Sequence, residues 1–188
     1  MMNKSEKKLI KNWKKKMQII QSDDLLLYHK KFSYLLFINH FSDYVTKYQN
    51  YDYLKKVLCI GCYHGHWVNR IDQQTNIKAF IVDQSPKLLT LSMHMYPHFS
   101  YQLMDHQHIP YKDKKFHYTI INIPLDALID VESTFKEVYR VLKRKGQCIC
   151  YIRRITKVER YLDLLNHLGF NNLHVTQYKS ITVIEIKK

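Results

Sequence analysis

VLCIGCYHG, the sequence of residues 57–65, is an apolar run that enters a turn between two glycines. Gly61 and Gly65 let the backbone approach a ligand closely, and a helix that starts after them offers unpaired N–H groups. The same stretch holds a Cys-x-x-Cys pair, Cys59 and Cys62, followed by His64. This stretch therefore allows three interpretations, which are a nucleotide-binding loop, a redox pair and a metal site. The rest of the sequence must distinguish between them.

From residue 55 onward, short β-branched runs alternate with helical stretches. The runs predict strands over residues 56–60, 77–82, 99–103, 117–122, 147–152, 172–176 and 181–186. The stretches between them predict helices over residues 65–72, 85–96, 131–142 and 157–168. This alternation is typical of crossover units, and the short turn between the last two strands makes an antiparallel hairpin. We expect an α/β three-layer sandwich with a seven-stranded, mostly parallel sheet and one antiparallel strand near an edge.

The first 50 residues have a different pattern. Residues 4–20 carry apolar side chains at helical spacing with most lysines on the opposite side, which predicts a basic amphipathic helix. A second predicted helix begins after Ser22 and runs to about residue 47. We interpret residues 1–50 as a helical N-terminal cap that belongs to the same domain as residues 51–188.

An acidic residue marks the end of the second predicted strand. In an open α/β sheet, ligands bind beyond the carboxyl ends of the strands, where the strand order reverses. The first strand ends at Gly61, and the second ends in Asp83, 22 residues later. An acid at that place suits the two hydroxyls of a ribose, so these positions indicate a cofactor that contains a nucleoside.

Four blocks of sequence make this interpretation specific. They are VLCIGCYHG at residues 57–65, IVDQSP at 81–86, DHQHIPYKDKKFH at 105–117 and FKEVYRVLKRKG at 135–146. In order and spacing they resemble the class I S-adenosylmethionine-dependent methyltransferases, particularly the small-molecule branch that includes the quinone-biosynthesis methyltransferases. The blocks of that family read VLDIGCGTG, GVDxSP, DAExLPFPDxSFD and LxExxRVLKPGG. The resemblance covers about residues 55–188 and implies a Rossmann-like fold in which residues 51–188 bind S-adenosylmethionine.

The resemblance also implies where the cofactor binds. In the family, the glycine turn holds the methionine part, the acid after the second strand binds the ribose, and the acid of the third block meets the adenine amine. The corresponding cofactor-binding positions are Gly61, Cys62, Tyr63, Gly65, Asp83, Gln84, Asp105, His106 and Asn122. Residues 122–126 follow the fourth strand, where the family lines its methyl-transfer pocket, and Asp126 is the candidate for a general base there.

The chain departs from the family pattern at three places. Cys59 stands where the family has an acid, and Tyr63 stands where it has its middle glycine. The change at Cys59 removes a partner for the ammonium group of the cofactor, and a tyrosine does not easily adopt positive φ. Arg144 and Lys145 replace the usual Pro-Gly. We therefore expect either a rebuilt turn, helped by the neighbouring histidines, or weak cofactor binding.

The cysteines also allow a metal site, which we do not expect. In the strand order of the family, one strand separates the strands that carry Cys59 and Cys148, so these two lie about 10 Å apart. Zinc–sulfur bonds are only about 2.3 Å long. We expect reduced, buried cysteines instead, with His64, His66 and His106 near the mouth of the pocket.

Charge and hydropathy limit the partners and the compartment. The net charge of +14 favours acidic partners such as nucleic acid or an anionic surface, through the basic N-terminal helix and residues 143–145. No apolar run reaches the roughly 18 residues that span a bilayer. The lysine-rich N-terminus lacks the apolar segment of a signal peptide, so we expect a cytoplasmic protein.

These patterns support one main hypothesis and leave two alternatives open. The main hypothesis is the transfer of a methyl group from S-adenosylmethionine to an unidentified small-molecule acceptor. The first alternative is a methyltransferase for RNA or another nucleic acid that uses the basic surface. The second is a binding or regulatory protein that keeps the methyltransferase fold without binding the cofactor.

Overall fold

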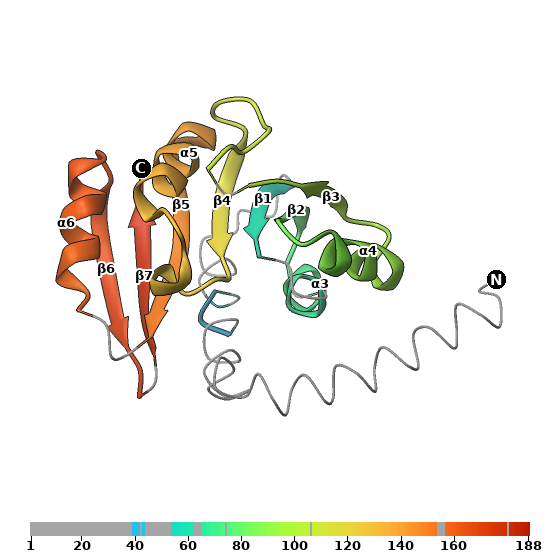
Figure 1. Cartoon of the computed structure of the whole chain (residues 1–188), viewed down its shortest axis with the longest axis horizontal. Helices are drawn as coiled ribbons and strands as arrows, with labels where there is room; N and C mark the ends of the chain where they lie inside the picture. The colour runs from blue at the N-terminus through green and yellow to red at the C-terminus, as the bar shows by residue number, and fades with distance from the viewer. Residues whose placement is uncertain are drawn as a thin grey trace. The chain divides into compact units, whose positions relative to one another are not determined.

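Figure 1 shows the computed structural model of the chain, which describes residues 39–41, 43, 54–61, 65–73, 75–105, 107–153, 157–179 and 181–188. The chain divides into two compact units, Met1–Leu36 and Phe37–Lys188, and all described residues belong to the second. The predicted helix over residues 4–20 and most of the one over 22–47 lie outside the described residues. The boundary between a cap at 1–50 and a domain at 51–188 stays a prediction.

The described residues contain a seven-stranded sheet with the strand order β3-β2-β1-β4-β5-β7-β6 (Figure 1). The strands are β1 (Lys55–Ile60), β2 (Ile77–Asp83), β3 (Ser100–Leu103), β4 (Phe116–Ile121), β5 (Leu142–Arg153), β6 (Asn171–Gln177) and β7 (Ile181–Lys187). All pairs are parallel except those of β7, which is antiparallel to β5 and β6. The predicted sheet is confirmed. Its order reverses between β1 and β4, whose carboxyl ends flank the crevice where such sheets bind ligands.

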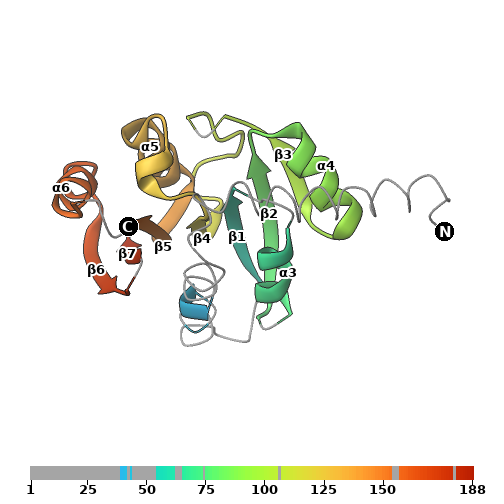
Figure 2. The same ribbon diagram turned by 60° about the horizontal axis from the view of Figure 1, so that its bottom comes forward.

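Helices pack on both faces of this sheet. They are α3 (His66–Asp72), α4 (Pro86–Met95), α5 (Val131–Val141) and α6 (Glu159–His167), together with the short 3₁₀ helix η2 (Leu125–Ala127). Figure 2 shows α5 and α6 on one face, and α3 with the helical residues 39–41 on the other. None of the helices in the described part of the chain is long and apolar enough to cross a bilayer.

Two helix starts show why the sequence folds as it does here. The hydroxyl of Ser85 accepts the N–H of Leu88 at 3.3 Å, and Pro86 occupies the first turn of α4. The carboxylate of Asp130 accepts the N–H of Ser133 at 2.9 Å at the start of α5. Both helices lie within the predicted ranges.

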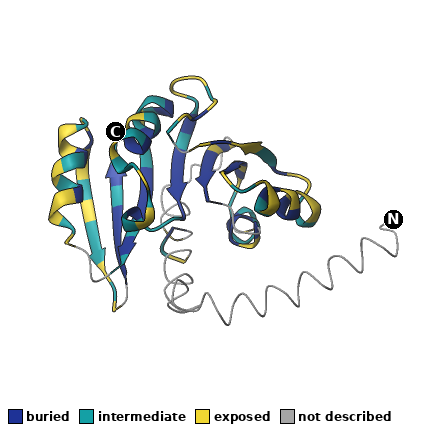
Figure 3. Ribbon diagram, viewed as in Figure 1, coloured by how far each residue is buried: buried dark blue, intermediate teal, exposed yellow. Residues whose placement is uncertain are grey.

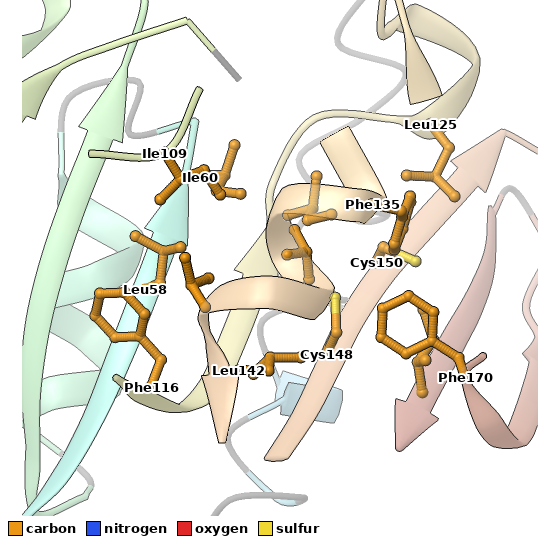
Figure 4. Close-up of a cluster of buried hydrophobic side chains, with 14 of the residues drawn as sticks. Leu58, Ile60, Ile109, Phe116, Leu125, Phe135, Leu142, Cys148, Cys150 and Phe170 are labelled. Atoms are coloured by element: carbon orange, nitrogen blue, oxygen red, sulfur yellow. The ribbon is translucent and has the colours of Figure 1, made fainter. Parts of the chain in front are cut away.

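The core follows the strands across the middle of the sheet (Figure 3). On the face under α5 and α6, Leu58, Phe135 and Phe170 belong to one buried cluster that draws on β1, α5 and the start of β6 (Figure 4). Each such side chain contributes about 1.5–3 kcal/mol when fully buried. Near β1 and β2 the same cluster takes in Met104 and Ile109, from the segment between β3 and β4.

Strand β5 begins earlier than predicted. It starts at Leu142, directly after α5, whereas the sequence pattern predicts a start at residue 147. Leu142 pairs with Phe116, and the register then shifts before the next pair. Lys145 takes φ +62° within this irregularity. A left-handed residue within the strand thus lies in the interval, residues 143–146, that the sequence pattern leaves between the predicted helix and strand.

Candidate functional site

The glycine turn lies at the carboxyl edge of the sheet, where β1 ends and α3 begins. Gly61 has φ +83°, and a Cβ there would lie 2.7 Å from Cγ1 of Ile123. Gly65 has φ +74°, and a Cβ there would lie 2.9 Å from Cδ2 of Tyr96. Backbone conformation and lack of space therefore both require glycine. Cys62, Tyr63 and His64, between these glycines, lie outside the described residues, so their roles stay predictions.

The acid at the end of β2 is fixed by its own loop. Asp83 is buried, and its Oδ1 accepts the N–H of Ser85 at 2.9 Å. Val82 pairs in register with Ile60, so Asp83 stands beside the end of β1 and the glycine turn. This is the arrangement that the sequence predicts for a ribose-binding acid.

A cavity of about 100 Å³ opens along the same edge. Gln84, Asp105 and Gln107 contribute polar atoms to its lining. Apolar lining residues come from the segment after β4, and they include Ile123, Leu128 and Ile129. Polar groups that fix orientation beside apolar walls are typical of a pocket for a small organic ligand. The cavity brings together Gln84 and Asp105, as predicted; His106 lies outside the described residues.

The segment that carries Asp105 is held in place from α5. The guanidinium of Arg140 donates to the carbonyl oxygens of Ile109 and Tyr111, both at 2.8 Å. It also donates to Asp113 at 2.7 Å and to both carboxylate oxygens of Glu137 at 2.7 Å. Glu137 in turn accepts the N–H of Ile109 at 2.8 Å. The fork of Arg140 thus clamps residues 109–113 against α5, which a lysine could not do.

Within this clamp, Arg140 and Glu137 stabilise each other in their charged forms. The hydrogen bond from Arg140 lowers the pKa of the Glu137 carboxyl, and Glu137 raises the pKa of Arg140. Both residues belong to the fourth sequence block, yet sequence analysis assigned neither of them a role. The Glu-x-x-Arg spacing on a predicted helix was the available signal.

Asn122 lies at the end of β4 with its side chain completely buried. Its Nδ2 lies 3.5 Å from the carbonyl oxygen of Gly61, to which it donates. Its Oδ1 is buried and finds no hydrogen-bond donor in the described part of the protein. A buried acceptor without a partner costs about 1–3 kcal/mol, so this oxygen fits a donor group of a bound ligand at the glycine turn.

Asp126, the predicted general base, is engaged in an ion pair. Its Oδ2 accepts from Nε of Arg153 at 2.5 Å, and its Oδ1 accepts the N–H of Arg153 at 3.4 Å. The side chain of Asp126 is only 10% exposed. The pair ties the segment after β4 to the end of β5. Both carboxylate oxygens of Asp126 thus accept from Arg153, and its catalytic role stays a prediction.

Cys59 occupies the place of the family's acid with a side chain that is fully buried in the sheet. It pairs with Ile81 on one side and with Ile120 on the other. Strand β4 lies between β1 and β5, so the separation of Cys59 from Cys148 is as predicted. Burial raises the pKa of the Cys150 thiol, which keeps it protonated.

His66 is the described member of the predicted pocket-lining histidines. It is exposed at the start of α3, and its Nδ1 lies 3.1 Å from the hydroxyl of Tyr96. This contact joins the start of α3 to the end of α4. His66 therefore stands next to Gly65 but does not line the cavity described above.

Comparisons with known proteins agree with this geometry. Residues 58–150 match the family described as "Methyltransferase domain". The ubiquinone/menaquinone biosynthesis C-methyltransferase UbiE of Rickettsia akari is 24% identical over 106 residues, which are 53% of this chain and 43% of that protein. The UbiE protein of Rickettsia bellii matches to the same extent. The chain therefore matches less than half the length of these relatives.

Solved structures show the same fold. The CurJ carbon methyltransferase superimposes with a TM-score of 0.75 at 13% identity, over 89% of this chain and 60% of that one. An S-adenosylmethionine-dependent methyltransferase from Mesorhizobium loti superimposes with a TM-score of 0.68 at 12% identity, over 78% of this chain and 96% of that one.

Proposed function

Because the chain belongs to the class I S-adenosylmethionine-dependent methyltransferases, we propose that it transfers a methyl group from that cofactor to a small-molecule acceptor. The proposal rests on the features that lie together at the carboxyl edge of the sheet. A glycine turn, a buried acid at the end of β2, a cavity and a buried acceptor at Asn122 that has no donor among the described residues meet there.

The residues at this edge fit S-adenosylmethionine, the cofactor of the family. Asp83 would bind the ribose hydroxyls, and Asp105 with Gln84 would meet the adenine in the cavity. Gly61 and Gly65, with Cys62 and Tyr63 between them, would hold the methionine part, and His106 would stand beside Asp105. When bound, the cofactor supplies an electrophilic methyl group on a sulfonium. The task of the chain is then to align the acceptor with that methyl group and to exclude water.

Asn122 compensates in this proposal for the acid that Cys59 replaces. Its Oδ1 is an acceptor beside the carbonyl of Gly61, and it needs a donor. The ammonium group of the methionine part is such a donor. A neutral amide oxygen binds an ammonium more weakly than a carboxylate does, so we expect binding with reduced affinity rather than none.

A small molecule is the acceptor that the relatives favour. The UbiE proteins are named as C-methyltransferases of ubiquinone and menaquinone biosynthesis. We propose carbon methylation of a small organic acceptor by analogy with them, within the general class of methyltransferases.

Titration calorimetry with S-adenosylmethionine and with its demethylated product tests the proposal. We expect a micromolar dissociation constant for the wild type and at least tenfold weaker binding for Asp105→Asn. Asp163→Asn, an exposed aspartate on α6, is the matched control and should bind like the wild type. Absence of binding in the wild type would contradict the proposal and favour the cofactor-deficient alternative.

A second proposal concerns an anionic partner at the opposite edge of the sheet. Lys56 and Lys78 pair in register near the amino ends of β1 and β2, and Lys143 lies 3.0 Å from His117 on β4. Burial and the nearby lysines, with Lys143 first, lower the pKa of His117 to about 4. Nucleic acid that binds here should dissociate steeply as salt rises. Equal binding by the variant with Lys56, Lys78 and Lys143 all changed to Ala would contradict this proposal.

A further inference from the structure

His40 joins two residues that lie far from it along the chain. Its Nε2 lies 2.6 Å from Oε1 of Glu185 on β7, and its Nδ1 lies 2.7 Å from the hydroxyl of Tyr178, which follows β6. The side chains of His40 and Glu185 are each 15% exposed. The rings of His40 and Tyr178 meet edge-on with 5.9 Å between their centroids. We refer to these three residues as the His40 cluster.

The carboxylate fixes the direction of the hydrogen bonds in the His40 cluster. An ionised Glu185 only accepts, so the hydrogen of a neutral His40 sits on Nε2 and points at Glu185. Nδ1 then accepts the O–H of Tyr178. The oxygen of Tyr178 keeps its lone pairs for a hydrogen bond from another molecule.

Among the described residues, the negative charges of Glu185 and Asp43 act on the phenol of Tyr178. Burial, followed by Glu185 and Asp43, raises the pKa of Tyr178. The group is therefore a neutral phenol at physiological pH. A neutral phenol that already donates to an imidazole can pass a proton on, which an isolated tyrosine cannot do.

Contacts along the carboxyl edge link the His40 cluster to the proposed site. The N–H of Tyr178 donates to the carbonyl of Ile181 at 2.8 Å, and Ile181 pairs with Arg153 of β5. Arg153 in turn binds Asp126, in the segment that supplies the apolar lining of the cavity. The hairpin that carries Tyr178 is therefore continuous with the segment after β4.

The segment that carries His40 also contacts α3 and β4. Asn39 accepts from Arg70 of α3 at 3.1 Å, and Phe41 packs edge-on against Tyr118 of β4 with 6.5 Å between ring centroids. Figure 2 shows this segment on the face of the sheet that α3 covers. It thus lies between α3, which opens after the glycine turn, and the hairpin of β6 and β7.

We propose that the His40 cluster is a proton relay for the methyl acceptor, an assignment that rests on the proposed methyl transfer. The acceptor presents an O–H group, as a phenol or an enol does. Its O–H bond breaks, the proton passes to the oxygen of Tyr178, and the electron pair stays on the acceptor. The former proton of Tyr178 forms the Nδ1–H bond of His40, and Glu185 stabilises the imidazolium.

The charges balance over one turnover. With the cofactor bound, the acceptor carbon that shares this electron pair would take the methyl group, so the negative charge of the acceptor and the positive charge of the sulfonium would be removed together. A phenol methylated at carbon then loses the proton of that carbon to water and regains one on its oxygen, which restores the aromatic ring. His40 then releases its extra proton to water, and the cluster returns to its starting state. Tyr178 touches the acceptor in this scheme, whereas Glu185 acts through His40 as a positioning residue.

The test compares Tyr178→Phe and His40→Asn with the wild type. Catechol and hydroquinone serve as acceptor probes, and the formation of S-adenosylhomocysteine measures turnover. We expect kcat to fall at least tenfold in both variants, with cofactor affinity unchanged and with no further loss in the double variant, because the two residues act as one unit. His174→Asn is the matched control, since His174 pairs with Glu185 across the strands and is exposed.

Two further measurements distinguish a proton relay from a contact that only stabilises the fold. Glu185→Gln removes the charge opposite the imidazolium, so kcat should fall while KM and cofactor affinity stay unchanged. Long-range ¹H–¹⁵N NMR of the ligand-free wild type should show His40 with its hydrogen on Nε2. A hydrogen on Nδ1, or an unchanged kcat in Glu185→Gln, overturns the relay.

The outcomes also distinguish the relay from the proposed function. A wild type that binds the cofactor but turns over neither probe contradicts both. An active wild type with an equally active Tyr178→Phe variant contradicts the relay alone. Loss of activity that follows loss of the folded state in thermal unfolding shows a structural tie and likewise overturns the relay.

Discussion

The two halves of the carboxyl edge are built in different ways. Around Asp83 and Asp105, the first contacts are local: Asp83 binds Ser85, and Asp105 accepts the N–H of Gln107 at 3.0 Å. Around Tyr178, the contacts of His40 span 138 and 145 residues. The first half could therefore be recognised as motifs, and the second half only appears when the chain is folded.

This difference has a physical consequence for each half. Local turns hold the cofactor half together with the clamp of Arg140, whose partners lie 3 to 31 residues away. The His40 cluster exists only while residues 39–41 pack against β7 and α3, so local opening of this short segment is enough to disrupt it. We expect cofactor binding to survive changes that disrupt the His40 cluster.

Arg140→Ala should have the largest effect, and it tests whether the clamp belongs to the cofactor half alone. The change leaves the Glu137 carboxylate and two backbone carbonyls without their partner, which should cost about 3 kcal/mol of unfolding free energy. Cofactor affinity should fall as residues 109–113 loosen, while the hydrogen on His40 stays on Nε2 by NMR. Urea unfolding and calorimetry measure both effects.

Arg144→Ala is the matched control for that experiment. Arg144 is exposed four residues further along the chain, and its loss should change stability by less than about 0.5 kcal/mol. Equal destabilisation by the two variants would mean that net charge, rather than the clamp, sets the stability of this region.

Gly61→Ala should have the next largest effect. The left-handed conformation costs about 1–2 kcal/mol for any residue with a Cβ, and the methyl group would also press on Ile123. We expect a loss of about 2 kcal/mol in stability and a larger loss in cofactor affinity, since the turn moves. A variant that binds the cofactor like the wild type would show that the turn is not part of the site.

The sequence predicted the parts of the molecule that rest on period and local spacing. The strands, the helices and the hairpin are of this kind. The strand order and the place of Asp105 at the binding edge were implied by the resemblance to the methyltransferase family. The ion pair of Asp126 with Arg153 could not be predicted, because it joins the 3₁₀ helix after β4 to the last residue of β5. The early start of β5 was not predicted either. Nothing in the sequence indicates that a lysine will adopt positive φ and continue the strand. The roles of Cys62, Tyr63 and His106 stay predictions.

The next effect concerns His117, which lies outside both halves. We expect it to make the folded protein less stable at acidic pH. The folded protein holds the pKa of His117 near 4, below the 6.5 of an unfolded histidine. Between these values the unfolded chain binds more protons, so stability should fall as pH falls from about 6.5 to 4 and should not change above 6.5 through this group. With the partial exposure of His117 taken into account, we expect a loss of about 1–2 kcal/mol.

His117→Asn should flatten this pH dependence, as measured by thermal unfolding between pH 4 and 8. His174→Asn removes an exposed histidine and should leave the slope unchanged. An unchanged slope in His117→Asn would show that His117 is not the source of the acid lability.

Ser85→Ala should have the smallest effect and sharpens the idea that local contacts build the cofactor half. The change removes the cap of α4, which is typically worth about 1 kcal/mol. The backbone N–H that Asp83 accepts remains, so the carboxylate should keep its place. We expect lower stability in urea unfolding with unchanged cofactor affinity in calorimetry. If affinity falls as well, the acid at the end of β2 is held by the start of α4 rather than by its own loop, and the cofactor half depends on helix docking as the His40 cluster does.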